Sequence, residues 1–205
     1  MLIHDRLPLS TVNGPGSRAV IWFQGCSLAC PGCWNPSTHS FAGGVQISPE
    51  ELAGWILSCP EIEGVTLSGG EPFQQAGELL RLVELLRRLR PDLTIGLFTG
   101  YTLKELVSGS WKWLHLPSMR WEQGSSELFE RIRECLDFAV MGRFVRGLTD
   151  SQSPLCGSAN QRVVFFTGRY SRDDLEPQAY EVLISADGEQ VTTTGFPHQL
   201  VNITL

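Results

Sequence analysis

Short apolar runs alternate with amphipathic stretches along most of the chain. The clearest run extends from Val20 to Phe23, and its four consecutive apolar side chains are typical of a strand buried on both faces. Four further runs of similar length lie downstream. The predicted strands are residues 18–24, 65–68, 93–99, 136–141 and 162–167.

Helix signals lie between these strands. Residues 48–51, Ser-Pro-Glu-Glu, form a capping box, because the serine accepts from free N–H groups of the first turn and proline suits the first helical position. A second capping box occupies residues 102–105, and leucines recur with a helical period over residues 79–89. Strands that alternate with helices predict right-handed crossovers and a mainly parallel sheet.

The C-terminal part is predicted to form a β-hairpin. Apolar side chains alternate with other residues over residues 180–184, residues 186–188 suit a turn, and residues 190–194 would form the second strand. A closed eight-unit barrel takes about 250 residues, so this chain is short for one. We therefore expect one α/β domain over residues 1–205: a partial (open) TIM-like barrel of about six parallel strands with a C-terminal hairpin.

Composition restricts the class of protein and its possible partners. The 205 residues are 42% hydrophobic and 19% charged, which is ordinary for a globular domain. Apolar stretches fall far short of the ~20 residues that span a bilayer, and no signal segment is visible, so we expect a cytoplasmic protein without a membrane partner. A net charge of -6 argues against nonspecific nucleic-acid binding.

Three cysteines carry the strongest chemical signal. Cys26, Cys30 and Cys33 are spaced C-x3-C-x2-C directly after the first predicted strand. Soft sulfur ligands from one short loop suit an iron-sulfur cluster, and three thiolates leave one iron open for chemistry. A zinc site is the alternative, but zinc ligands usually come as two pairs, and a second C-x2-C is missing. The other cysteines, Cys59, Cys135 and Cys156, read as buried small apolar residues.

This spacing, together with Gly-Gly-Glu-Pro at residues 69–72, resembles the radical S-adenosylmethionine (radical SAM) enzymes. The branch it resembles most is that of the activating proteins of anaerobic ribonucleotide reductase. Further matching pieces are residues 13–16, 33–36, 99–101 and 157–162. Two positions depart from that branch: Asn13 and Met141 stand where aspartate is usual or frequent.

The resemblance implies the activity and its cofactors. A [4Fe-4S] cluster held by the three cysteines would reduce S-adenosyl-L-methionine, and the resulting 5'-deoxyadenosyl radical would remove a hydrogen atom. The implied partners are a glycyl-radical protein such as anaerobic ribonucleotide reductase and a flavodoxin- or ferredoxin-type electron donor. No catalytic residue is expected beyond the cluster ligands, and His4, His39, His115 and His198 show no metal spacing.

The same resemblance implies a set of cofactor-binding residues near the carboxyl ends of the strands. Glu71 could pair with the methionine ammonium or brace its own loop, and Asn160 and Arg162 could bind the methionine carboxylate or order the last strand. The expected cofactor-binding residues are Trp34, Asn35, Gly69, Gly70, Glu71, Thr99, Gly100, Asn160 and Arg162.

Residues 108–126 form a tryptophan-rich insertion, longer than the corresponding stretch of the reductase activators. It carries Trp111, Trp113 and Trp121 without a clear period. A lid or partner-docking loop and a packed surface insertion both fit this pattern.

Three functions remain open on the sequence. The first is a glycyl-radical activase, and the second is a radical SAM enzyme that modifies a peptide or small molecule in another pathway. The third is an iron-sulfur electron-transfer or assembly protein that never cleaves the cofactor.

Overall fold

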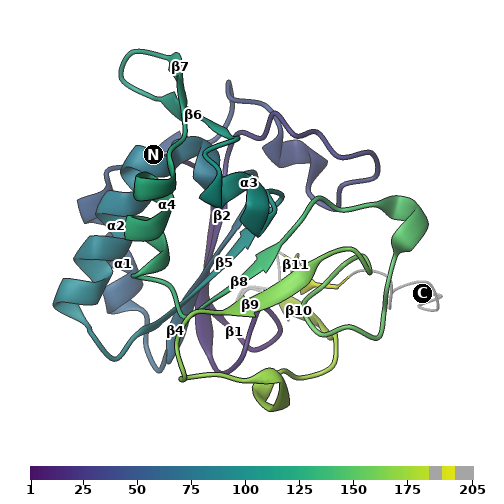
Figure 1. Cartoon of the computed structure of the whole chain (residues 1–205). Helices are drawn as coiled ribbons and strands as arrows, with labels where there is room; N and C mark the ends of the chain where they lie inside the picture. The colour runs from purple at the N-terminus through teal and green to yellow at the C-terminus, as the bar shows by residue number, and fades with distance from the viewer. Residues whose placement is uncertain (185–190, 197–205) are drawn as a thin grey trace.

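The computed structural model describes residues 1–184 and 191–196. A seven-stranded sheet crosses the molecule in the order β3-β1-β2-β4-β5-β8-β9 (Figure 1). Its strands are β1 (Leu2–Ser10), β2 (Arg18–Phe23), β3 (Val45–Gln46), β4 (Gly64–Gly69), β5 (Thr94–Thr99), β8 (Phe138–Met141) and β9 (Arg162–Phe165). The five strands expected from the apolar runs correspond to β2, β4, β5, β8 and β9.

The centre of the sheet is parallel and its margins are antiparallel. β2, β4, β5 and β8 run in one direction, whereas β1, β3 and β9 run against their neighbours. The sheet thus holds four parallel strands where about six were expected. The reason lies in the connections: no α-helix separates β1 from β2 or β8 from β9, so neither connection makes the crossover that a parallel pair needs. Curvature into a partial barrel stays a prediction.

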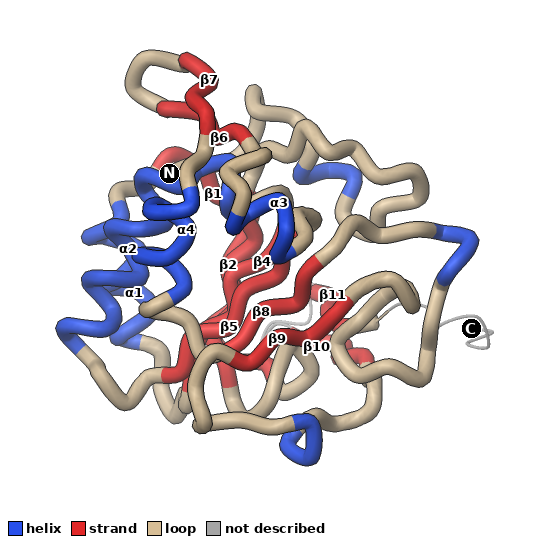
Figure 2. The backbone as a smooth tube through the Cα atoms, in the orientation of Figure 1, coloured by secondary structure: helices blue, strands red, loops and turns tan. Residues whose placement is uncertain are grey.

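The α-helices gather on one face of the sheet (Figure 2). They are α1 (Pro49–Ser58), α2 (Ala76–Leu89), α3 (Leu103–Val107) and α4 (Ser126–Arg133). Both expected capping boxes are present, at the starts of α1 and α3. The buried faces of α1, α2 and α4 pack on alternate residues of the parallel strands, such as Ile21, Leu67 and Leu97, and form the larger hydrophobic core.

The opposite face of the sheet meets the C-terminal hairpin, β10 (Tyr180–Ile184) and β11 (Val191–Gly195), whose expected turn lies outside the described residues (Figure 1). A second, smaller hydrophobic cluster lies on this side and includes Phe138, Leu155 and Phe196. Short 3-10 helices complete the described chain: η1 (Pro36–Thr38), η2 (Pro72–Gln75), η3 (Arg146–Leu148) and η4 (Arg172–Asp174).

The tryptophan-rich insertion forms a separate two-stranded ribbon, β6 (Lys112–His115) with β7 (Arg120–Gln123). A surface formed by all three of its tryptophans is ruled out, because Trp111 is only 2% exposed and belongs to the main core. Trp113 is partly buried against the same core, whereas Trp121 is 45% exposed and its ring lies 5.4 Å from that of Phe41. The insertion therefore combines a packed base with one exposed tryptophan.

A buried arginine ties together the amino ends of the parallel strands. Arg18 is fully buried, and its guanidinium donates to the hydroxyl groups of Thr66 and Thr94 and to the main-chain oxygens of Pro15, Val65 and Thr94. These acceptors replace the water that the charge loses on burial.

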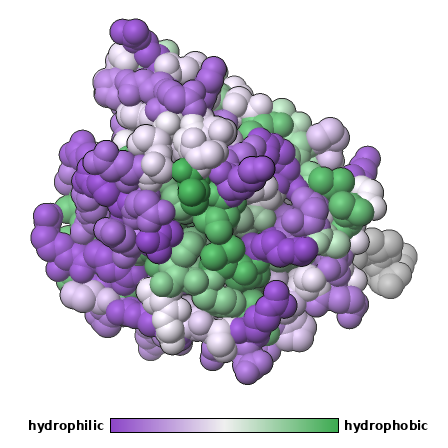
Figure 3. All heavy atoms as spheres, viewed as in Figure 1, coloured by the Kyte–Doolittle hydropathy of each residue, from purple (hydrophilic) through white to green (hydrophobic). Residues whose placement is uncertain are grey.

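The surface of the face seen in Figure 3 has an apolar area near its middle, ringed by hydrophilic side chains. None of the helices within the described residues has the length and apolar character needed to cross a membrane.

Candidate functional site

The cysteine loop leaves the carboxyl end of β2 and is fixed by hydrogen bonds on both sides. The main-chain N–H of Cys26 donates to the oxygen of His39 at 3.0 Å. The N–H of Ser27 donates to Oε1 of Gln74 at 2.8 Å, and Nε2 of Gln74 donates back to the Ser27 hydroxyl at 2.7 Å. Gln74 belongs to η2, so the cysteine loop is held against the segment that follows β4.

The three cysteines of this loop are half-buried and border one small cavity of about 120 Å³. Gly32 has a φ of +77°, a left-handed conformation that glycine adopts without strain, and this turn brings Cys33 back beside Cys30. Burial raises the pKa of the Cys26 thiol to about 11 and also raises the pKa of Cys33. Binding of a metal would have to displace these protons.

The two glycines after β4 allow the main chains of neighbouring loops to approach closely. A Cβ atom on Gly69 would lie 2.5 Å from the nitrogen of Phe23, and one on Gly70 would lie 2.5 Å from the oxygen of Gly25. Gly69 also has a φ of +95°. Only glycine fits at both positions, and both residues border the cavity of the cysteines.

Glu71 is buried at 1% exposure and braces two loops. Its Oε1 accepts from the N–H of Phe73 at 3.0 Å and from the Thr99 hydroxyl at 2.8 Å, and its Oε2 accepts from the N–H of Gly100 at 2.7 Å. Desolvation raises the pKa of Glu71 to about 7, while these hydrogen bonds act in the opposite direction. Of the two roles considered for this carboxylate, the geometry favours bracing, and Thr99 and Gly100 are its partners.

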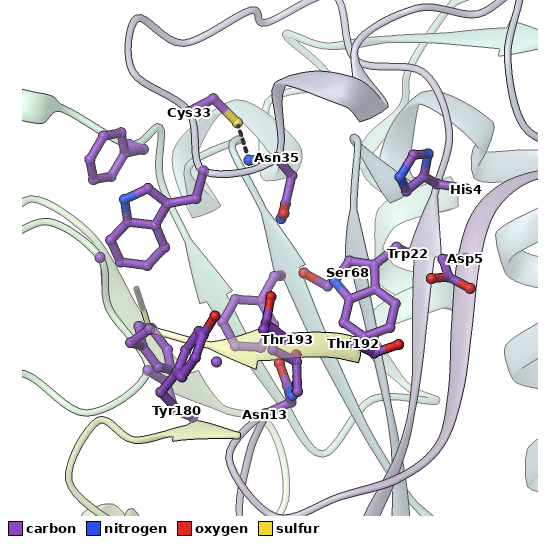
Figure 4. A pocket seen from close by; sticks show the side chains of 18 of the residues that line it. His4, Asp5, Asn13, Trp22, Cys33, Asn35, Ser68, Tyr180, Thr192 and Thr193 are labelled. Atoms are coloured by element: carbon purple, nitrogen blue, oxygen red, sulfur yellow. Dashed lines mark hydrogen bonds between the residues drawn. The ribbon is translucent and has the colours of Figure 1, made fainter. Parts of the chain in front are cut away.

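A larger cavity of about 370 Å³ adjoins the small one (Figure 4). The two cavities share five lining residues: Cys33, Ser68, Phe98, Phe144 and Gln161. Ligand pockets usually measure about 300–1,000 Å³, so the larger cavity has room for a cofactor-sized molecule and the smaller one does not.

Trp34 and Asn35 lead from the cysteines into the larger cavity and line it. The Trp34 ring lies 5.3 Å from the ring of Phe144 and 5.6 Å from that of Phe196, so it presents an aromatic wall. The N–H of Asn35 contacts the Cys33 sulfur at 3.4 Å, and Figure 4 shows the Asn35 side chain directed into the cavity. Both expected residues are thus brought next to the cysteine loop.

Asn160 and Arg162 line neither cavity, and their cofactor-binding role stays a prediction. Both are exposed: Asn160 donates to the oxygen of Arg143, and Arg162 donates to the oxygens of Ala159 and Gln161. Their second considered role, ordering the last strand of the sheet, agrees with these contacts.

Gln161, which the sequence did not single out, lines both cavities. Its Oε1 accepts from the N–H groups of Gly157 and Ser158, and its Nε2 donates to the oxygen of Gly142. Successive side chains point to opposite sides as the chain enters β9, which explains why this residue faces inward between two exposed neighbours. Phe98 and Ser68 were missed too, although their positions at the ends of β5 and β4 were a usable signal.

The residues around the small cavity fit an iron-sulfur cluster better than a single ion. No group of three or more His, Cys, Asp or Glu within the described residues is arranged to hold one metal ion, but thiolates that bind different irons of a cluster need not converge on one point. His39 also lines this cavity, and its buried Nε2 has no hydrogen-bond partner among the described residues. A cluster sulfide is an acceptor that an N–H at this position could use.

Comparison with known proteins agrees with this geometry. The family model of a 4Fe-4S single cluster domain matches residues 12–164. The anaerobic ribonucleoside-triphosphate reductase-activating protein of Vibrio cholerae serotype O1 is 31% identical over 173 residues, which cover 82% of this chain and 99% of the relative. The chain belongs to the family of anaerobic ribonucleoside-triphosphate reductase-activating proteins.

Other members of this reductase-activating family show the same range of similarity. The Escherichia coli K12 protein is 31% identical over 169 residues, covering 80% of this chain and 97% of the relative. The bacteriophage T4 protein is 38% identical over 109 residues, covering 50% of this chain and 69% of the relative. The family expected from the motifs is confirmed, and so is the 4Fe-4S domain; β10 and β11 lie beyond the residues that the family model matches.

Proposed function

We propose that this protein is a radical SAM activase that installs a glycyl radical on anaerobic ribonucleotide reductase or a similar partner. The observation that carries the proposal is the junction of two cavities at Cys33: three thiols border the small one, and the adjoining one has the volume of a cofactor site. The names and the coverage of the relatives support the same reaction.

The cysteines, Glu71 and Trp34 have different roles in this proposed activity. Cys26, Cys30 and Cys33 would hold a [4Fe-4S] cluster, and three thiolates would leave one of its irons available to S-adenosyl-L-methionine. When bound, the cluster and S-adenosyl-L-methionine together supply a one-electron cleavage that yields a radical able to remove a hydrogen atom. Glu71 keeps the loops after β4 and β5 in register, and Trp34 provides an apolar wall that excludes water from the larger cavity.

The decisive experiment mixes anaerobically purified, reconstituted protein with a candidate reductase, S-adenosyl-L-methionine and a flavodoxin- or ferredoxin-type donor. We expect a glycyl radical signal in the electron paramagnetic resonance spectrum of the partner. Cys30→Ala should abolish both the signal and the bound iron, whereas Cys156→Ala should retain them, because Cys156 is buried in the smaller hydrophobic cluster and lines neither cavity.

The same mixture distinguishes the other functions. Cleavage of S-adenosyl-L-methionine without any radical on the partner would favour the alternative of a radical SAM enzyme that acts on a peptide or small molecule. One observation favours this alternative: the C-terminal hairpin lines the larger cavity from a side that the matched family model does not include. No cleavage at all, with an intact cluster, would leave an electron-transfer or assembly protein.

A further inference from the structure

The C-terminal hairpin supplies one side of the larger cavity. Tyr180 of β10 and Thr192, Thr193 and Thr194 of β11 line it, opposite Trp22 and Ser68 of the sheet. Figure 4 shows Tyr180 and Thr193 with their hydroxyl groups directed into the cavity, and Thr192 further along the hairpin. The matched family model ends at residue 164, so this wall is an addition to the 4Fe-4S domain.

The hairpin is fastened to the body of the protein by polar contacts. The carboxylate of Glu181 accepts from the hydroxyl of Ser10 at 2.7 Å and from the N–H and hydroxyl of Thr11 at 2.9 and 2.7 Å. The Asn13 side chain donates to the Thr194 hydroxyl at 2.9 Å. These contacts join the hairpin to the end of β1 and the loop before β2.

An aromatic contact seats the end of the hairpin on the cysteine side of the cavity. Phe196, 6% exposed, meets Trp34 edge to face at a ring distance of 5.6 Å. The hairpin is therefore held at two places, by Ser10 and Thr11 through Glu181 and by Trp34 through Phe196.

The chemistry of this wall suits a nucleoside. In the proposed function the amino-acid end of S-adenosyl-L-methionine lies near the cysteines, so the remainder of the molecule extends into the larger cavity. Trp34, Phe98 and Phe144 line that cavity with aromatic surface for a base, whereas the hairpin presents hydroxyl groups. Hydroxyls both donate and accept, which is what ribose oxygens and adenine nitrogens require.

We propose that the β10–β11 hairpin is part of the cofactor site, with the hydroxyl groups of Tyr180, Thr192 and Thr193 binding the nucleoside part of S-adenosyl-L-methionine. This assignment rests on the proposed function, because it places the cofactor in the larger cavity. It makes the C-terminal addition a binding element of this chain.

The test measures binding of S-adenosylhomocysteine to the reconstituted protein by calorimetry, without reductant or partner. Tyr180→Phe, Thr192→Val and Thr193→Val each remove one hydroxyl at nearly constant shape. We expect a dissociation constant raised about 2- to 10-fold where the hydroxyl contacts the ligand, and a larger rise for the triple variant. The matched control is Ile184→Thr, which changes a hairpin side chain that is 67% exposed and does not line the cavity.

A second variant acts through the anchoring of the hairpin. Glu181→Ala removes the acceptor of the contacts with Ser10 and Thr11 and should also weaken binding, with iron content and circular dichroism unchanged. If the wild-type protein fails to bind S-adenosylhomocysteine, the proposed function fails. If the wild type binds and the triple variant and Glu181→Ala bind as tightly as the control, the hairpin assignment is overturned and the proposed function stands.

Discussion

Glu71 provides the most quantitative test of how the site is built. Glu71→Ala removes the acceptor of three donors: the buried N–H of Phe73, the buried hydroxyl of Thr99 and the partly buried N–H of Gly100. An orphaned buried donor costs roughly 1 to 3 kcal/mol, which sums to about 3 to 9 kcal/mol for three. Water entering the vacated space and rotation of the hydroxyl recover part of this. We expect the free energy of unfolding to fall by about 3 to 5 kcal/mol, a large share of the roughly 5 to 15 kcal/mol of a typical domain.

Glu71→Gln refines the same test. An amide keeps the volume and one acceptor oxygen, but its NH₂ group then faces a donor, because among the described residues Oε2 accepts only from the N–H of Gly100. One unmet donor predicts a loss of about 1 to 3 kcal/mol, between the wild type and the alanine variant. The matched control is Glu122→Ala, an exposed position on β7 that should change stability by less than about 0.5 kcal/mol.

The assay is urea unfolding of the cluster-free protein followed by tryptophan fluorescence, at pH 8, above the raised pKa of about 7 of the Glu71 carboxyl. Binding of S-adenosylhomocysteine to the reconstituted variants is measured in parallel. A Glu71→Ala protein within about 1 kcal/mol of the wild type would refute the bracing role. If such a protein also bound the ligand far more weakly, Glu71 would be a direct cofactor contact.

Three further predictions concern stability and docking. Arg18→Met removes the buried guanidinium and leaves the oxygens that accept from it, including those of Thr94, without this donor. The free energy of unfolding should fall by about 2 to 4 kcal/mol, and a fall below about 1 kcal/mol in urea unfolding would contradict this role of Arg18. Hydrogen bonds from Arg143 lower the pKa of Glu105 to about 2, so this carboxylate stabilises the fold above its ordinary pKa near 4.5 and loses the contribution as the pH falls towards 2. Acid titration by circular dichroism should therefore show a smaller stability loss over that interval for Glu105→Gln than for the wild type. Trp121→Ala should leave unfolding within about 1 kcal/mol of the wild type, because the side chain is 45% exposed, yet slow the activation of a partner that docks on the β6–β7 ribbon; an unchanged activation rate would place docking elsewhere.

Local sequence signals were enough to predict the parallel centre of the fold. The apolar run that became β2 and the capping boxes of α1 and α3 depend on neighbouring residues only. β1 was not predicted, because Leu2–Ser10 contains polar residues and a proline and lacks a regular alternation of apolar and polar side chains. The direction of β9 could not be predicted either, because an apolar run has the same pattern in a parallel and in an antiparallel strand pair.

The site shows the same division between local and distant determinants. The cysteine loop and the glycines before Glu71 could be recognised as candidate site residues from the sequence, because each forms a short motif of neighbouring residues. Gln161 lies in a matching piece, but which side chain of that piece faces the cavities depends on the packing of β9, and Tyr180 reaches the larger cavity only through the packing of the hairpin. Arg18, a buried charge held by neutral oxygens, was invisible for the same reason.

The anchoring of the cysteine loop bears on whether the chain folds before or after the cluster is inserted. Cys26 and Ser27 are fixed through main-chain groups and Gln74, and these bonds do not involve the sulfur of Cys26. The three thiols come from a single loop rather than from separate strands, so the cluster is not needed to staple the sheet together. Folding can therefore come first and metal delivery second, with the finished chain as the acceptor. The same independence means that a cluster lost to oxidation can be replaced in a protein that has stayed folded.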